Sequence, residues 1–220
     1  MIVIMSLWRN DADRQLEERI AHLLAKTCVG HEVRWLWAVG DSVDDTEYIL
    51  RRAAAKDSRI TVIRSDSGVP GNDLSSRRFR ASWTASHMFS EIHEDAKYAC
   101  LHESDLLSPP DVLDQLLATK TPVAAWPIIR LNGHPQFYDI WAFRGLDGVP
   151  FTSNMQPPAY PVCVRSFGSC WIAPANLVRN RVLDETAIVG LCQQWFNEGV
   201  TMWVNPSVVV EQPTGLWELS

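Results

Sequence analysis

Two carboxylates separated by one residue are the first candidates for chemistry in this sequence. Glu103 and Asp105 flank Ser104 and follow directly on the apolar run 98–101, which predicts a strand. Carboxylates at this spacing leave a strand end on the same side and can share one hard divalent cation. Mg²⁺ or Mn²⁺ held in this way keeps coordination positions open for two phosphate oxygens. The alternative is a solvated turn that caps the next helix, because acidic residues are common in turns.

A cluster of arginines is the second candidate. Arg77, Arg78 and Arg80 open a helix that the sequence predicts over 77–92. Positive side chains are unfavourable at this end of a helix dipole unless an anion lies nearby. Together with the N-terminal amides of the helix, these guanidiniums could neutralise a diphosphate. The alternative is a basic surface patch that pairs with Glu91, Glu94 or other carboxylates.

Polar residues also follow the first two predicted strands. The first loop carries Ser6, Arg9 and Asn10, and the second carries Asp41. Asn10 and Asp41 are suited to hydrogen-bonding a nucleobase or a ribose, and Arg9 is suited to phosphate. Ordinary turn chemistry would use the same residue types, so it remains the alternative.

The elements that must position these residues follow a regular order. Apolar runs predict strands over 2–7, 33–39, 60–63, 98–101 and 123–129, and helical periodicity fills the intervals between them. This β-α-β-α-β order predicts an α/β sandwich, in which helices flank a central and mostly parallel sheet. Ligands of such sheets bind beyond the carboxyl ends of the strands. The acidic pair and both polar loops should therefore open on one edge.

Bulk properties limit the classes of partner. A chain of 220 residues suits a single domain, and its formal net charge of −6 weakens DNA or an anionic membrane as a partner. Five scattered cysteines predict reduced thiols and not a disulfide framework. No apolar stretch approaches the roughly 18 residues needed for membrane insertion. Together these features predict a cytoplasmic protein.

The order of these segments resembles the GT-A glycosyltransferase fold. The Glu103-Ser-Asp105 element stands where that family has its D-x-D element. The segment Tyr138-Asp-Ile-Trp-Ala-Phe-Arg144, followed by Leu146-Asp-Gly148, resembles the Y-D-x-W-x-x-R…D-G segment of fungal capsule and cell-wall mannosyltransferases. The stretch from Val189 to Pro206 resembles the closing helix and strand of many GT-A enzymes.

The resemblance implies one GT-A-like, Rossmann-like domain over 1–220. Residues 1–106 would form the nucleotide-sugar half, and residues 107–220 would form the acceptor-side half. The implied reaction moves a sugar from a UDP- or GDP-linked donor to a hydroxyl group. The acceptor could be a saccharide, a protein, a small molecule or a modified DNA base. The donor-binding set is then expected to be Ser6, Arg9, Asn10, Asp41, Arg77, Arg78, Arg80 and Ser104.

The metal and catalytic residues are expected at positions that depart from the family pattern. The family often supplies a late histidine as a metal ligand, and this sequence has Glu211 there instead. The metal set is thus Glu103, Asp105 and Glu211, with Mn²⁺ or Mg²⁺. The acidic pair that usually precedes the closing helix is missing, which leaves Asp139 or Glu185 as the catalytic carboxylate and favours transfer with retention.

Residues on the sugar side come from the mannosyltransferase-like segment and a later turn. Asp139 could equally be an interior carboxylate satisfied by Arg144 or by backbone amides. Gly168 and Ser169 could bring backbone close to donor or acceptor, or could form a plain strand turn. The expected contacts to the acceptor or to the transferred sugar are Tyr138, Trp141, Gly168 and Ser169.

Two other functions compete with glycosyl transfer. A non-catalytic nucleotide-sugar or sugar-binding module could keep the fold and lose the chemistry. A nucleotidyltransferase should carry a glycine-rich, lysine-containing phosphate loop near its first strand. The segment Ser6-Leu-Trp-Arg-Asn10 has neither glycine nor lysine, which places the nucleotidyltransferase last.

Overall fold

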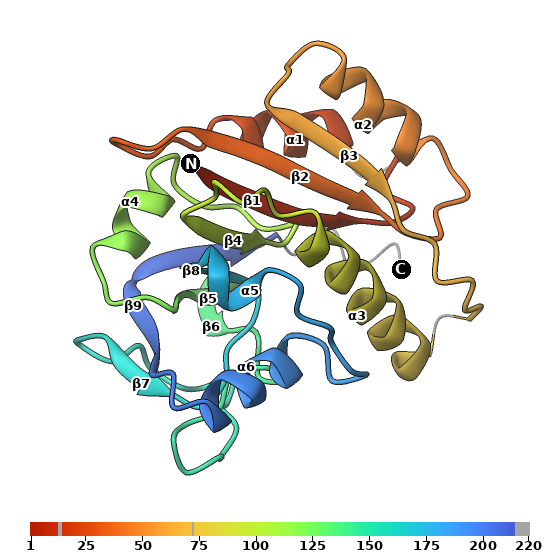
Figure 1. Ribbon diagram of the computed structural model, residues 1–220. Coiled ribbons are helices and arrows are strands. Elements are labelled where there is room, and N and C mark those ends of the chain that lie inside the picture. Colours follow the sequence, from red (N-terminus) through yellow and green to blue (C-terminus); the bar gives the residue numbers. More distant parts are fainter. Residues whose placement is uncertain (13–14, 72, 214–220) are drawn as a thin grey trace.

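One mixed sheet runs through the molecule and carries helices on both faces (Figure 1). The computed structural model describes residues 1–12, 15–71 and 73–213. The strand order in the sheet is β3-β2-β1-β4-β8-β5-β9-β7, and β6 pairs with β5. The strands are β1 (Ile2–Trp8), β2 (Val33–Val39), β3 (Ile60–Arg64), β4 (Tyr98–His102), β5 (Val123–Leu131), β6 (His134–Phe137), β7 (Val162–Val164), β8 (Cys170–Pro174) and β9 (Met202–Gln212).

The helices divide between the two faces of the sheet. Buried residues of α3, α5 and α6 pack in one core, and those of α1, α2 and α4 pack in the other. Along β1, Val3 and Met5 face the first core, whereas Ile2 and Ile4 face the second. The α/β sandwich is thus confirmed. The helices are α1 (Leu16–Leu24), α2 (Thr46–Ala54), α3 (Leu74–Ser90), α4 (Val112–Leu117), α5 (Ala175–Val178) and α6 (Ile188–Asn197).

The N-terminal part of the sheet is parallel, as predicted. Ile2 of β1 lies opposite Val33 of β2 and Tyr98 of β4, and β3 extends the same sheet beyond β2. The strands β1 and β2 are buried on both faces over most of their length, which is why they read as apolar runs, whereas β3 at the edge of the sheet is partly exposed. Their parallel carboxyl ends bring the loops after β1, β2 and β4 to one edge.

The helix α3 begins earlier than the sequence predicted. It starts at Leu74, and the carboxylate of Asp73 accepts hydrogen bonds from the amides of Ser75 (3.1 Å) and Ser76 (3.0 Å). Arg77 therefore lies inside the first turns and not at the end of the helix. The expectation that free N-terminal amides would help bind a diphosphate is wrong for these two amides, because Asp73 already caps them.

The C-terminal part of the sheet mixes directions. The strand β8 inserts antiparallel between β4 and β5, and β6 and β7 also pair antiparallel with their neighbours. The central pair β5 and β9 is parallel. The sequence did not predict β6, β7 or α5, which are short and lack a clear periodic pattern.

The strand β9 contains an irregularity that changes which face its residues meet. Ala125 lies opposite Asn205, but Trp126 lies opposite Val209, so residues 206–208 are additional on β9. Before this point Met202 and Val204 pack in the core of α3 and α6; after it Val208 and Val210 pack in the opposite core. The odd number of extra residues explains the exchange of faces.

Two predictions about the chemical setting can be compared with the structure. All five cysteines are free thiols, as expected. Within residues 1–12, 15–71 and 73–213, no helix has the length and apolar character needed to span a bilayer.

Candidate active site

Three carboxyl groups gather beyond the end of β4. Glu103 and Asp105 lie in the turn after β4, and Asp139 comes from the segment that follows β6. Burial, followed by the charges of Asp105 and Asp139, raises the pKa of Glu103 well above its usual range. Among the residues that the structure describes, no lysine or arginine forms an ion pair with any of the three. We call Glu103, Asp105 and Asp139 the acidic group.

A glutamine from the end of β9 reaches this group. Gln212 is fully buried, and its Nε2 donates a hydrogen bond to Oδ2 of Asp105 at 2.9 Å. Its Oε1 is also buried and has no hydrogen-bond partner in the described part of the chain. The neighbouring Glu211, expected as a metal ligand, instead pairs with Arg130 at 3.0 Å. The residue at the end of β9 that contacts the acidic group is therefore Gln212, and not Glu211.

The donor set suits a hard cation only when Gln212 is counted. No group of three histidine, cysteine, aspartate or glutamate side chains that could hold a metal occurs within the described residues. An amide oxygen is a further ligand type for Mg²⁺ or Mn²⁺, and Oε1 of Gln212 is a buried acceptor in need of a partner. Two carboxylates plus this oxygen fit a divalent ion, and a cation would offset the mutual repulsion that raises the pKa of Glu103.

Asp139 is fixed in place by its surroundings. Its Oδ2 accepts from the hydroxyl of Ser169 at 2.6 Å, and its Oδ1 accepts from the amide of Ala142 at 3.2 Å. Burial outweighs these hydrogen bonds and raises the pKa of Asp139. A Cβ at Gly168 would lie 2.4 Å from Oδ2 of Asp139, so this position has room only for glycine. Arg144 forms no ion pair with Asp139, and no other lysine or arginine among the described residues does so.

Aromatic and basic side chains border the acidic group. Burial and the charges of Glu103, Asp105 and Asp139 raise the pKa of Tyr138, while Arg77 acts in the opposite direction. These effects place Tyr138 within electrostatic reach of the three carboxyls on one side and of Arg77 on the other. The guanidinium of Arg78 lies 4.4 Å from the ring centre of Trp141, so α3 touches the segment that carries Asp139.

The third arginine of α3 has a partly structural role. Arg80 is buried, and its Nη1 donates to the carbonyls of Val69 (3.0 Å) and Gly71 (2.7 Å). Its Nη2 is buried without a hydrogen-bond partner among the described residues. Burial, followed by the positive charge of Arg9, lowers the pKa of Arg80. Arg9 and Arg80 thus form a basic pair that an anion would stabilise.

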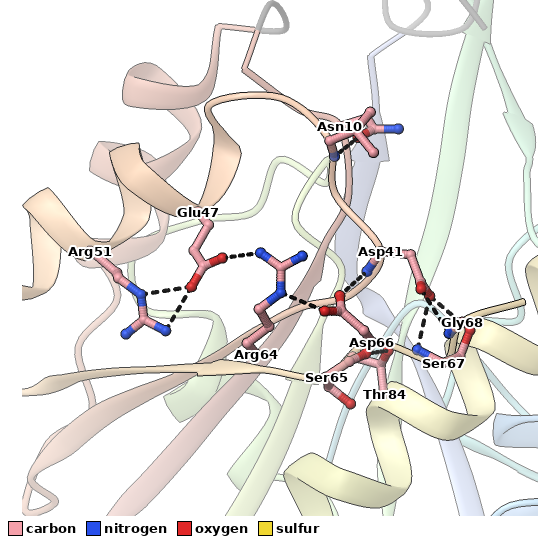
Figure 2. A network of polar contacts seen from close by, with 11 residues as sticks. Asn10, Asp41, Glu47, Arg51, Arg64, Ser65, Asp66, Ser67, Gly68 and Thr84 are labelled. Carbon is pink, nitrogen blue, oxygen red and sulfur yellow. Dashed lines mark hydrogen bonds and ion pairs between the residues drawn. The ribbon is translucent and has the colours of Figure 1, made fainter.

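The loop after β2 satisfies its polar groups internally. Asp41 accepts from the hydroxyl (2.7 Å) and amide (3.1 Å) of Ser67 and from the amide of Gly68 (3.0 Å), as Figure 2 shows. Oδ1 of Asn10 accepts from the amide of Val43 at 3.0 Å. Both side chains therefore hold loops together, and a contact between Asp41 and a donor would have to share an oxygen already in use.

Two predicted donor residues act inside the structure. Ser6 is fully buried, and its hydroxyl donates to the carbonyl of His102 at 2.7 Å, which ties β1 to the end of β4. Oγ of Ser104 accepts from Nη2 of Arg19, and its carbonyl accepts from Nε of the same guanidinium, both at 2.9 Å. Arg19 is also paired with Asp11 at 3.0 Å. The sequence offered no signal for Arg19, since it lies on a helix far from the acidic pair.

A buried polar network packs against the turn after β4 that carries Glu103 and Asp105. Nζ of Lys26 donates to the carbonyl of Ser108 at 2.7 Å and lies 3.0 Å from Nε2 of His22, while the ring of His102 contacts the hydroxyl of Ser108 at 2.8 Å. Burial lowers the pKa of His102 to about 3 and that of His22 to about 4. Both rings are therefore neutral at pH 7 and do not balance the charge of Glu103.

The second catalytic candidate lies elsewhere. Glu185 is exposed in the loop before α6, and no hydrogen bond or ion pair joins it to the acidic group among the described residues. Its neighbour Asp184 accepts from the amide (2.8 Å) and hydroxyl of Thr186. The structure thus brings Asp139, and not Glu185, to the two carboxylates after β4.

Comparison with known proteins identifies the fold. No protein family and no curated protein sequence matches this chain. By structure, the chain is similar to the mannosyltransferase PcManGT from Pyrobaculum calidifontis, solved in complex with GDP-Man and Mn²⁺, with a TM-score of 0.62 at 13% sequence identity. The superposition covers 96% of this chain and 56% of that one, so this chain spans about half its length. The α/β sandwich described above is accordingly a Rossmann-like fold of the glycosyltransferase type.

Proposed function

We propose that this chain is a metal-dependent glycosyltransferase that uses a nucleoside-diphosphate sugar, with a GDP-linked sugar as the first candidate. The observation that carries the proposal is the acidic group. Three carboxyls lie together without a cationic partner in the described chain, beside the buried Oε1 of Gln212. The fold and the GDP-Man and Mn²⁺ of the structural neighbour support this choice of donor and ion.

The proposed metal ligands are Glu103, Asp105 and Oε1 of Gln212. Held there, the ion would supply Lewis-acid stabilisation of the charge that develops on a departing diphosphate. Arg77 acts electrostatically on Tyr138, which the three carboxyls also influence, and Nη2 of Arg80 is buried without a hydrogen-bond partner among the described residues. These guanidiniums are proposed to bind the phosphates, where preorganised donors lower the barrier most.

Asp139 is the proposed carboxylate at the reacting sugar. The hydroxyl of Ser169 and the amide of Ala142 hold it in one orientation, which suits a group that must face a cationic transition state. Trp141 and Tyr138 flank it and are proposed to contact the sugar ring. Glu185 is exposed and makes no described contact with the acidic group, so we do not assign it as a general base for inversion, and we propose transfer with retention.

Binding of the donor tests the proposal directly. Calorimetry would measure GDP-mannose and UDP-glucose binding with and without Mn²⁺, for the wild type, Asp105→Ala and Gln212→Leu. Loss even of a group that only supports a metal ligand costs roughly 10–100-fold in affinity, so loss of a neutral ligand should cost at least as much. We expect a loss of that size for Gln212→Leu and a larger one for Asp105→Ala, because Asp105 is a charged ligand.

The matched control is Asp95→Ala, whose side chain is 80% exposed and pairs only with His93. It removes the same charge and should bind donor as the wild type does. Unchanged Mn²⁺-dependent binding in Asp105→Ala would refute the metal site. Tight donor binding without released nucleoside diphosphate, across many hydroxyl acceptors, would instead identify a nucleotide-sugar-binding module.

A further inference from the structure

A separate pocket of about 310 Å³ lies in the C-terminal half. Three segments form it: the turn after Asp139, the link between β7 and β8, and one side of α6. None of its residues belongs to the acidic group. We call it the arginine pocket, and its lining residues are Arg144, Gly148, Arg165, Ser166, Val189 and Gln193.

The two arginines in this pocket keep their positive charges unbalanced. Neither Arg144 nor Arg165 forms an ion pair with a carboxylate in the part of the chain that the structure describes. Arginine stays protonated at any physiological pH, so both charges are permanent. In an acidic chain with a net charge of −6, two unpaired guanidiniums in one concavity are a local reversal of sign.

The surroundings hold one of these guanidiniums in place. Nη2 of Arg165 donates to Oε1 of Gln193 at 3.1 Å, and its guanidinium carbon lies 4.8 Å from the ring centre of Phe196. Gly148 lies beside the same group, since a Cβ there would be in ordinary van der Waals contact with Nη1 at 3.5 Å. A side chain already ordered by neutral partners loses little entropy when it binds an anion.

The pocket is linked to the acidic group through one residue, Ala142. The hydroxyl of Ser166, which lines the pocket, donates to the carbonyl of Ala142 at 2.6 Å. The amide of Ala142 and the hydroxyl of Ser169 both donate to Asp139. The segment 139–148 therefore carries Asp139 at its start and the pocket residues Arg144 and Gly148 further along.

We propose that the arginine pocket binds a phosphate monoester carried by the acceptor, whose hydroxyl then lies toward Asp139. A phosphate monoester carries about two negative charges at neutral pH and matches two guanidiniums, whereas a carboxylate carries one. The role of the bound molecule as an acceptor rests on the proposed function, whereas the binding of its phosphate in the arginine pocket does not.

Calorimetry with three probes tests the assignment: mannose 6-phosphate, mannose and inorganic phosphate. EDTA in the buffer keeps the metal site out of the measurement. The variants are Arg144→Gln, Arg165→Gln and Arg77→Gln. Arg34→Gln is the control, because Arg34 is half exposed on β2 and paired with Glu32. Arg144→Lys and Arg165→Lys keep the charge without the planar fork, and thermal unfolding confirms that each variant folds.

We expect mannose 6-phosphate to bind the wild type, Arg34→Gln and Arg77→Gln alike, and to bind Arg144→Gln and Arg165→Gln at least tenfold more weakly. The lysine variants should fall in between, and mannose should not bind. The proposal would be overturned if mannose 6-phosphate bound the Arg144 and Arg165 variants as tightly as the wild type. It would also be overturned if only Arg77→Gln lost affinity for mannose 6-phosphate. Inorganic phosphate that binds as tightly as the phosphorylated sugar would show a free-phosphate site and would refute the acceptor assignment.

The same measurements separate this inference from the proposed function. Asp105→Ala should lose Mn²⁺-dependent donor binding and keep the binding of mannose 6-phosphate. Failure of donor binding with an intact, arginine-dependent phosphate site would refute only the glycosyltransferase proposal. Intact donor binding without a phosphate site would refute only the arginine pocket.

Discussion

The carboxylates after β2 and after β4 lie beyond the same ends of the sheet but differ in their partners. Partial burial acts against the charge of Asp41, yet hydrogen bonds from Ser67 and Gly68 lower its pKa below the ordinary value. Burial and two neighbouring carboxyls instead raise the pKa of Glu103. A carboxylate satisfied by its own chain stabilises the fold, whereas one that its chain leaves unbalanced costs stability and is open to a ligand.

The difference also explains why residue type alone does not identify a donor site. Asp41 and Asp105 both follow a buried strand, and both were expected to meet the donor. The loop 65–68 folds back over Asp41 and supplies its hydrogen bonds (Figure 2). In the part of the chain that the structure describes, the hydrogen-bond partner of the Asp105 carboxylate is the neutral Gln212.

The largest expected effect is on the free energy of unfolding and comes from Lys26, the buried cation that could balance the charge of Glu103. Lys26 is 2% exposed, and burial lowers its pKa from 10.5 to about 8. Between these values the unfolded chain binds the proton and the folded chain does not, so stability rises with pH from about 8 to 10.5 and stays at its lower level below pH 8. The gap corresponds to about 3 kcal/mol.

The variant Lys26→Met removes this dependence. Urea unfolding from pH 7.5 to pH 10.5 should show the wild type gaining about 3 kcal/mol relative to the variant. The affinity for Mn²⁺ at pH 7.5 should stay within threefold, because Lys26 is not the partner of Glu103. A tenfold rise in Mn²⁺ affinity in Lys26→Met would show that Lys26 does balance the acidic group, and the contrast with Asp41 would then disappear.

A smaller effect is expected at Asp41. The change Asp41→Asn leaves one acceptor oxygen where two now serve three donors, so the loop loses charge-assisted hydrogen bonds worth about 2 kcal/mol. Chemical denaturation would measure this loss, and donor affinity should change little. A large loss of donor affinity with unchanged stability would restore Asp41 as a donor-binding residue.

The smallest effect has the opposite sign. The change Asp105→Asn removes one of the repelling charges and keeps an oxygen for Nε2 of Gln212. We expect the metal-free protein to gain on the order of 1 kcal/mol, in the range of optimised charge substitutions. The thermal midpoint in EDTA should rise, and added Mn²⁺ should stabilise only the wild type. A lower midpoint in EDTA would mean that the acidic group is already balanced.

The fold of the first half could be predicted from sequence because its inner strands β1 and β2 are buried on both faces. Continuous apolar runs such as β1 and β2 have few alternatives in an α/β chain. The second half mixes short antiparallel strands with long loops, and β7 has only three residues. Its pairing depends on contacts between distant segments, which periodicity does not record.

The candidate site shows the same division. The turn with Glu103 and Asp105 follows β4 as expected, and Asp139 reaches it through the tertiary fold. Gln212 could not be chosen from sequence, because the choice between it and Glu211 depends on how β9 pairs with β5. Arg19 could not be predicted from sequence either, since its contact with Ser104 joins residues 85 positions apart.

The irregularity in β9 has a consequence for any comparison of this chain with others. Side chains alternate between the two faces of a strand. Three extra residues therefore place every later side chain of β9 on the face opposite to the one it would have in a regular strand. A regular β9 would turn Gln212 toward the face of Met202 and Val204. With the shift, it shares the face of Val208 and Val210 and meets Asp105. Whether the number of extra residues is odd or even, and not the residue type at an aligned position, therefore decides which residue at the end of β9 reaches the acidic group.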